Sequence, residues 1–178
     1  TNISADHLDW HGGFANYSHD KSKVFVNAQK AIVYNADDPV VSQHAHDVQL
    51  PATCQKVGFT LHAPQSGQIG VQDGWIVDRS SLSHSYSDVS DGRIIALSDF
   101  SAQLCDGNGH VYPHLIADGL AAIGAALAVR VPLSDIRTAL AHFTPDPHRI
   151  QLVAQYRDPA DGQSDPIAFI DDSKATDI

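Results

Sequence analysis

The fold is decided by the stretch Ala31-Ile32-Val33-Tyr34, which runs directly into Asn35-Ala36-Asp37-Asp38-Pro39. A short apolar run with a polar carboxyl end is typical of a strand that is buried in a parallel sheet. Pro39 has the fixed φ that suits the first turn of a helix, so we expect a short helix over residues 40–46. A second strand is predicted over residues 56–61. The alternation of strand and helix indicates a doubly wound α/β sheet.

Upstream of this stretch, a helix is predicted from Gly13 onward. Its apolar residues recur at steps of three and four, so they share one face: Phe14, Tyr17, Val24, Phe25 and Ala28. Lys21 lies in the middle of this face. A lysine in such a place usually extends its ammonium group to water. Alternatively, partial burial favours the neutral amine, which can react with carbon dioxide to give a carbamate, an oxygen ligand suited to Mg²⁺.

Downstream, we expect a small antiparallel patch, two helices and two final strands. The dipeptide Asp73-Gly74 predicts the hairpin turn of the patch. Ser134 is expected to cap the second helix, and residues 144–147, which include two prolines, end it. The predicted ranges are 68–72, 75–78 and 93–100 for the strands of the patch, with a polar loop over 79–92 and a turn over 106–109. The two helices are predicted over 114–129 and 133–143, and the final strands over 150–156 and 167–170.

Composition limits the class of protein. The chain has 178 residues, of which 43% are hydrophobic, and a net charge of −10, so we expect a folded domain that does not bind nucleic acid. Cys54 and Cys105 are far apart and lack metal-site spacing, which predicts reduced thiols in a cytoplasmic protein. We expect no membrane span and no signal peptide. Without an initiator Met, the chain is expected to be a piece of a longer protein.

Two polar clusters are candidates for chemistry. Near the start, Asp6, His7, Asp9 and His11 stand within six positions and are either metal ligands or a solvated loop in which one Asp caps a helix. Near the end, Asp171-Asp172-Ser173-Lys174 follows a predicted strand, where ligands gather in open α/β sheets. Arg149 lies at a predicted junction between two structural units, where a guanidinium can hold a phosphate through two hydrogen bonds. Each cluster can also be read as ordinary surface polarity.

Taken together, these motifs resemble the Mur ligase family. The stretch from Asn2 to Gly12, Asp20-Lys21 ahead of Val24-Phe25, and Tyr34-Asn35-Ala36-Asp37-Asp38 are similar to the central ATPase domain of that family. The closing Asp171-Asp172-Ser173-Lys174-Ala175-Thr176, after Pro147-His148-Arg149, is similar to the branch that adds D-glutamate. The resemblance spans nearly the whole chain except for residues 62–112.

The resemblance implies an α/β fold in two parts. Residues 1–147 would be a partial central ATPase domain, with a mostly parallel sheet, helices and a small antiparallel sheet, and without the phosphate-loop part that precedes it in the family. Residues 148–178 would be the first strands of a Rossmann-like C-terminal domain. We therefore expect that these 178 residues alone do not turn over substrate.

The resemblance also implies an activity of the full-length parent, in cytoplasmic peptidoglycan precursor synthesis. ATP would phosphorylate the carboxylate of UDP-N-acetylmuramoyl-L-alanine to an acyl phosphate. The amine of D-glutamate would then attack, and the tetrahedral intermediate would expel phosphate. The implied cofactors are ATP and Mg²⁺, which neutralises phosphate charge. The expected partners are these small molecules, and the expected state is a monomer.

Site residues follow from the same resemblance. His7 and Lys21, the latter as a carbamate, are implied to bind magnesium, and both are expected to take part in catalysis together with Lys174. ATP contacts are implied for Asp118, Arg149, Asp172 and Lys174, and a D-glutamate contact for Thr176.

Three residues depart from the family pattern. Leu115 and Asp118 stand where the family has two Asn, and Gln151 stands where Glu is common. An Asn amide can both donate to and accept from adenine, whereas Asp118 can only accept and Leu115 can do neither. A nucleotide- or partner-binding module without catalysis is therefore one alternative. A metal-dependent hydrolase that uses the Asp/His cluster is another.

Overall fold

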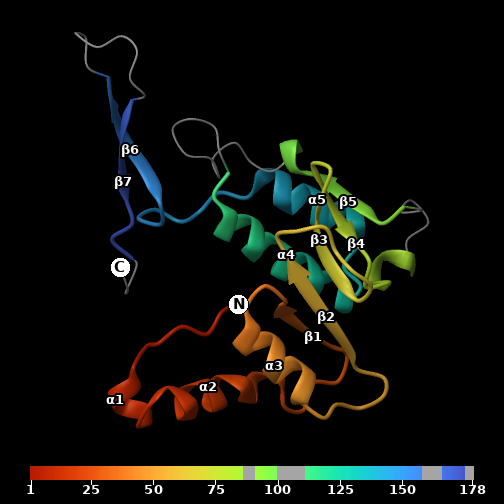
Figure 1. Ribbon diagram of the computed structural model, residues 1–178. Helices are drawn as coiled ribbons and strands as arrows, with labels where there is room; N and C mark the ends of the chain where they lie inside the picture. The colour runs from red at the N-terminus through yellow and green to blue at the C-terminus, as the bar shows by residue number, and fades with distance from the viewer. Residues whose placement is uncertain (86–90, 100–110, 158–165, 175–178) are drawn as a thin grey trace.

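The computed structural model describes residues 1–85, 91–99, 111–157 and 166–174. A five-stranded sheet, in the order β1-β2-β3-β4-β5, lies between helices (Figure 1). Its strands are β1 (Ala31–Asn35), β2 (Gln55–Thr60), β3 (Gln68–Gln72), β4 (Trp75–Asp78) and β5 (Arg93–Ala96). The helices are α1 (Leu8–His11), α2 (Phe14–Ser22), α3 (Pro39–Asp47), α4 (Pro113–Ala128) and α5 (Leu133–His142), with 3-10 turns at Lys23–Phe25, Leu82–Ser85 and Leu97–Asp99.

Strand β1 is covered on both faces, as its apolar run predicts. Ile32 and Tyr34 point to one side and belong to a cluster with Val41 and Ala45 of α3. Val33 points to the other side, toward α4, because successive strand residues alternate between faces. The helix comes close there: a Cβ added at Gly124 would lie 2.9 Å from the Val33 Cγ1 atom. Strand β1 is thus enclosed by α3 on one side and α4 on the other.

The sheet changes from parallel to antiparallel along its width. Strands β1, β2 and β3 are parallel neighbours, whereas β3, β4 and β5 run antiparallel. Asp73 and Gly74 form the turn between β3 and β4 with φ of 51° and 76°, as a two-residue hairpin requires. The predicted antiparallel patch is therefore confirmed, and it continues the parallel sheet. The strand predicted over residues 93–100 ends at Ala96, where a 3-10 turn begins.

The larger core lies between the sheet and helices α4 and α5. Leu120, Ile123 and Leu127 are buried on one face of α4 and pack with residues of β2 to β5. The expected cap of α5 is wrong: Pro132 occupies the N-cap position, and Ser134 lies inside the first turn. Its hydroxyl approaches Asp135 instead of a free backbone N–H. Proline already supplies the φ that starts the helix, so no side-chain cap forms.

The predicted helix from Gly13 is shorter than its apolar face suggests. Helix α2 ends at Ser22, and the chain tightens into a 3-10 turn through Phe25. A 3-10 turn has about three residues per turn, so the face shifts out of phase. Tyr17 and Phe25 remain buried, but Val24 is 76% exposed. The expected continuous apolar face through Val24 is therefore wrong.

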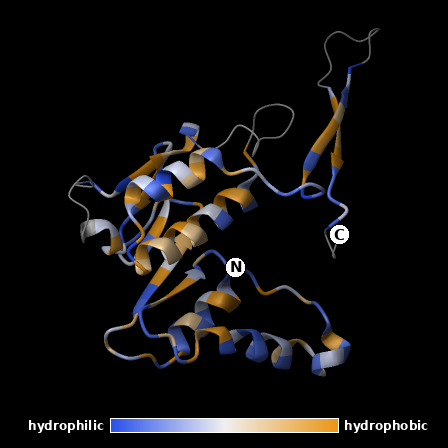
Figure 2. Cartoon of the chain, turned by 180° about the vertical axis from the view of Figure 1, so that it is seen from behind, coloured by the Kyte–Doolittle hydropathy of each residue, from blue (hydrophilic) through white to orange (hydrophobic). Residues whose placement is uncertain are grey.

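The last two strands form a sheet of their own. Strands β6 (Gln151–Tyr156) and β7 (Ile167–Asp171) pair antiparallel and stand apart from the five-stranded sheet in both overall views (Figures 1 and 2). Every residue of β6 is exposed, and Figure 2 shows hydrophobic colour along the ribbon. The exposed apolar side chains include Val153, Phe169 and Ile167. In the described ranges, no helix is long and apolar enough to cross a bilayer.

Candidate functional site at the N-terminal cluster and the hairpin base

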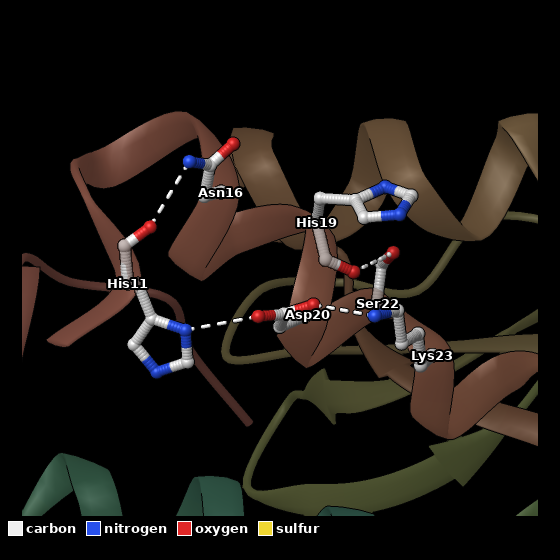
Figure 3. Close-up of polar contacts among 6 residues, drawn as sticks. All are labelled: His11, Asn16, His19, Asp20, Ser22 and Lys23. Atoms are coloured by element: carbon white, nitrogen blue, oxygen red, sulfur yellow. Dashed lines mark hydrogen bonds and ion pairs between the residues drawn. The ribbon is translucent and has the colours of Figure 1, made fainter.

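The N-terminal cluster is organised around the corner between α1 and α2. Gly12 and Gly13 turn the chain there with φ of 70° and 120°, a region open mainly to glycine. Across this corner the Nδ1 atom of His11 lies 2.9 Å from Asp20 Oδ2, and the Asn16 amide donates to the His11 carbonyl at 3.0 Å (Figure 3). His11 is therefore held by α2, a contact that neither the metal-ligand nor the solvated-loop interpretation of the cluster predicted.

Asp20 is the centre of this small network. The Lys23 ammonium donates to its other oxygen at 2.5 Å (Figure 3). The hydrogen bond from Lys23, followed by that with His11, lowers the pKa of the Asp20 carboxyl below its usual value. The carboxylate therefore stays charged well into the acid range and keeps the end of α2 joined to α1.

His7 and Lys21 are both placed at the surface. His7 precedes α1 in a left-handed conformation, φ 49°, with its Nε2 atom 3.1 Å from Asp6 Oδ2. Asp6 does not cap α1, because His7 occupies the N-cap position and makes no side-chain hydrogen bond there. Lys21 is exposed, and its ammonium lies 5.3 Å from the centre of the Tyr17 ring, a cation–π distance. Lys21 is thus exposed, as a lysine on an apolar helix face usually is, and the partial burial that the carbamate alternative invoked is absent. The role of Lys21 as a ligand stays a prediction.

Asp6 and His7 provide chemically suitable donors for a divalent cation. Within the ranges that the structure describes, however, no three His, Cys, Asp or Glu side chains gather closely enough to hold a metal ion. The described donors therefore supply only part of a ligand shell. The hydrolase alternative needs a metal site complete within the chain, and the described residues do not form one.

A cavity of about 1000 Å³ adjoins this cluster. It runs beside β1, between the N-terminal segment, α2 and the end of α4, and Asp6, Lys21 and Lys30 contribute to its wall. Tyr34 lies in the same wall, and burial raises the pKa of its phenol above the ordinary value. The cavity combines acidic, basic and hydroxyl groups beside a sheet edge, a suitable environment for a polar ligand.

Asp37 and Asp38 support the fold beside this cavity. Asp38 caps α3, accepting from the Val40 and Val41 amides at 2.8 and 3.0 Å, and its second oxygen accepts from the Ile3 amide at 2.9 Å. Asp37 accepts from the Leu61 amide at 2.8 Å and so joins the ends of β1 and β2. Neither the helix cap by Asp38 nor the link between strands by Asp37 was predicted from the sequence. An Asp directly before Pro at a helix start was the signal that predicts the cap.

Asp171 lies at the base of the hairpin. One carboxylate oxygen is 2.6 Å from the Nδ1 atom of His148, and the other accepts from the Ser173 amide at 3.0 Å. The side-chain hydrogen bond with His148, then those with Ser173, lower the pKa of Asp171 from 3.8 to about 2. This pair was not predicted from the sequence, because no local pattern links two residues 23 positions apart.

The residues expected to contact ATP at this end are exposed on the same base. The Asp172 carboxylate accepts from the Ile150 amide at 3.1 Å, and the Lys174 amide donates to the His148 carbonyl at 3.2 Å. Arg149 stands between the two residues that make these contacts. The structure therefore brings Arg149, Asp172 and Lys174 into one region.

Of the remaining predicted site residues, the structure describes Asp118 but not Thr176. Asp118 is exposed on α4, and Leu115 is partly buried against the larger core, where an apolar side chain suits packing. Thr176 lies outside the described residues, as do Cys105 and the turn predicted over residues 106–109. Among described residues, no hydrogen bond or ion pair joins the N-terminal cluster to the base of the hairpin.

Comparisons with known proteins define the class of protein. The family model of the Mur ligase middle domain matches residues 1–96, and the chain belongs to this family. The mixed sheet with flanking helices agrees with that assignment.

The names of individual relatives are more specific than the family. Over 176 residues the chain is 49% identical to UDP-N-acetylmuramoylalanine–D-glutamate ligase of Bifidobacterium longum (strain DJO10A), covering 99% of this chain and 35% of that protein. Over 175 residues it is 35% identical to the protein of the same name from Streptomyces coelicolor, covering 98% of this chain and 33% of that protein. The chain thus spans about a third of the length of these relatives.

Proposed function

We propose that the protein containing this chain joins D-glutamate to UDP-N-acetylmuramoyl-L-alanine at the expense of ATP, in cytoplasmic peptidoglycan precursor synthesis. The observation that carries this proposal is the 49% identity over 99% of the chain to a ligase of that name. The matched region includes both the N-terminal cluster and the base of the hairpin. The non-catalytic module rests only on Leu115 and Asp118, and the hydrolase would need a complete metal site, which the described residues do not form.

The proposed reaction has two steps. The carboxylate of UDP-N-acetylmuramoyl-L-alanine attacks the γ-phosphorus of ATP, which gives an acyl phosphate and ADP. The amine of D-glutamate then adds to the acyl carbon, loses a proton and displaces inorganic phosphate from the tetrahedral intermediate as the amide forms. Both steps gather negative charge on phosphoryl oxygens, so cationic groups must be positioned around them.

The chain's own residues fit parts of this task. Arg149 offers a planar guanidinium that can make two parallel hydrogen bonds to phosphate oxygens, and Lys174 offers a point charge beside it. Asp172 has one oxygen on the Ile150 amide and a second that can accept from a ribose hydroxyl. We assign Thr176 to the D-glutamate site and Asp118 to the adenine site on the basis of the resemblance.

We further propose that His7 and Lys21, the latter as a carbamate, contribute ligands to Mg²⁺. The support is the resemblance together with ligand chemistry. A carbamate would supply the anionic oxygen that Mg²⁺ prefers, His7 would be a minority nitrogen ligand, and Asp6 lies beside His7. Bound there, the ion would neutralise phosphate charge. The remaining ligands would come from groups outside the described residues.

We also propose a domain boundary at residues 147 and 148. Support comes from the two prolines just before it and from the separate sheet that follows. Residues 1–147 would then belong to the central domain and residues 148–178 to a C-terminal domain. We expect the complete protein to be a monomer, which light scattering on a sizing column can check.

The test of the proposed function is a phosphate-release assay on the full-length protein. ATP, UDP-N-acetylmuramoyl-L-alanine and D-glutamate together should release one phosphate for each D-glutamate consumed. Omitting D-glutamate, or replacing it with L-glutamate, should reduce the rate by at least about a hundredfold, because the acyl phosphate then lacks its amine. Phosphate release that is independent of D-glutamate would contradict the proposal and favour a hydrolase.

A further inference from the structure

The base of the hairpin, residues 148–151 and 171–174, is held together by side chains as well as by strand pairing. Gln151 and Asp171 are partners in the β6–β7 register, the last pair at that end. Beyond that pair, His148 meets Asp171 at 2.6 Å and Asp172 accepts from the Ile150 amide at 3.1 Å. The contacts therefore extend past the sheet to the residues on either side of Arg149.

The backbone around Arg149 is strained. His148 has φ of 66° and Ile150 has φ of 48°, both in the left-handed region that a β-branched residue such as Ile rarely adopts. Such a conformation persists only where surrounding contacts over-determine it. Here the His148 amide donates to the Gln151 side chain at 3.1 Å, and the His148 carbonyl accepts from the Lys174 amide at 3.2 Å.

The Asp171 carboxylate joins the two segments at the base of the hairpin through its contact with His148. Both oxygens of Asp171 are engaged, one with the His148 ring and one with the Ser173 amide. The His148 and Asp171 side chains are 54% and 27% exposed, so water weakens the pair without removing it. Because the pair binds residue 148 to residue 171, it sets the separation between the segment with Arg149 and the segment with Asp172 and Lys174.

We propose that His148 and Asp171 are positioning residues that hold Arg149 and Lys174 at the spacing needed to bind the phosphates of ATP. This inference rests on the proposed function, and it gives His148 and Asp171 a role that acts through Arg149 and Lys174. Their effect should therefore fall mainly on ATP binding.

The first test is kinetic and uses the full-length protein. Asp171→Ala should raise the KM for ATP about tenfold, since it removes a charge-assisted hydrogen bond to His148 and the carboxylate oxygen that accepts from the Ser173 amide. Asp171→Asn keeps an acceptor for the Ser173 amide and should recover part of the loss. The KM for D-glutamate should rise less than the KM for ATP, because the contacts that are lost order the residues around Arg149 and Lys174 directly, whereas Thr176 lies five positions beyond Asp171. Asp146→Ala is the matched control: it also removes a carboxylate near His148, but Asp146 has no hydrogen bond or ion pair with the described residues.

The second test does not depend on activity. Residue-resolved amide hydrogen exchange should show faster exchange at Ile150 and Lys174 in Asp171→Ala, with Asp146→Ala matching the wild type. If wild-type protein lacks D-glutamate-dependent phosphate release, the proposed function fails, while exchange still decides whether the pair orders the base. Unchanged exchange at both amides overturns the inference. So does an unchanged KM for ATP, or an equal rise of both KM values.

Discussion

At the residue scale, the fold shifts the pKa of the Asp171 carboxyl. Its pKa is lowered from 3.8 to about 2, first by the hydrogen bond with His148 and then by those with Ser173. The lowered pKa means that the folded state binds the proton less tightly than the unfolded chain does. Its contribution to stability is therefore present above about pH 4 and is lost as the pH falls toward 2.

This gives a direct prediction for the carboxyl group. In His148→Ala, the pKa of Asp171 should rise toward 3.8, because the leading cause of the shift is gone. Carboxyl carbon NMR across an acid titration measures it. His142→Ala serves as control, since that imidazole bonds to the Thr138 carbonyl in α5 instead. An Asp171 pKa that stays near 2 without His148 would show that Ser173 alone lowers it.

Single residues were the hardest part of the candidate site to predict. Periodicity placed Lys21 on an apolar face, yet its position depends on where α2 ends, and the structure leaves it exposed over Tyr17. The pairing of His148 with Asp171 spans 23 positions and exists only because β6 and β7 fold back on each other. Residue types could suggest charged sites, but partners so distant in sequence are set by the tertiary fold.

At the element scale, Asp38 does more than begin a helix. It caps α3 through two amides and fixes the N-terminal segment through Ile3. Asp38→Ala should lower the free energy of unfolding by about 1–2 kcal/mol, the usual effect of losing a good cap. Urea denaturation measures it. Asp47→Ala, at the exposed end of the same helix, should change stability by no more than about 0.5 kcal/mol. Equal effects of the two substitutions would contradict this role.

The existence of helices and strands was predicted better than the residues at which they begin and end. The strand at residues 31–34 and the helix after Pro39 were confirmed, because an apolar run and a proline are strong local signals. The Asp73-Gly74 hairpin was confirmed for the same reason. The apolar face through Val24 was predicted wrongly, since the 3-10 turn after Ser22 depends on packing that periodicity does not report. The cap of α5 was predicted wrongly because Ser134 was chosen although Pro132, a local signal, starts the helix.

At the scale of the whole molecule, the two sheets differ in how they are buried. Val57 and Phe59 of β2 lie in the larger core, whereas every residue of β6 is exposed. In the 178-residue chain, amides of β2 should therefore exchange at least about tenfold more slowly than those of β6, because opening β2 requires breaking the core. Exchange mass spectrometry separates the two peptides. Equal protection would show that the hairpin and the main sheet open as one cooperative unit.

The close approach of α4 to β1 has a mechanical consequence. With no side chain at Gly124, the helix lies directly on Val33, and such close packing leaves the strand and the helix little room to shift independently. Asp118 stands six residues earlier on that helix, about 9 Å along its axis at a rise of about 1.5 Å per residue. The end of the same helix contributes Ala125 and Ala128 to the wall of the cavity beside β1. We therefore expect a ligand that displaces this wall to displace Asp118 as well.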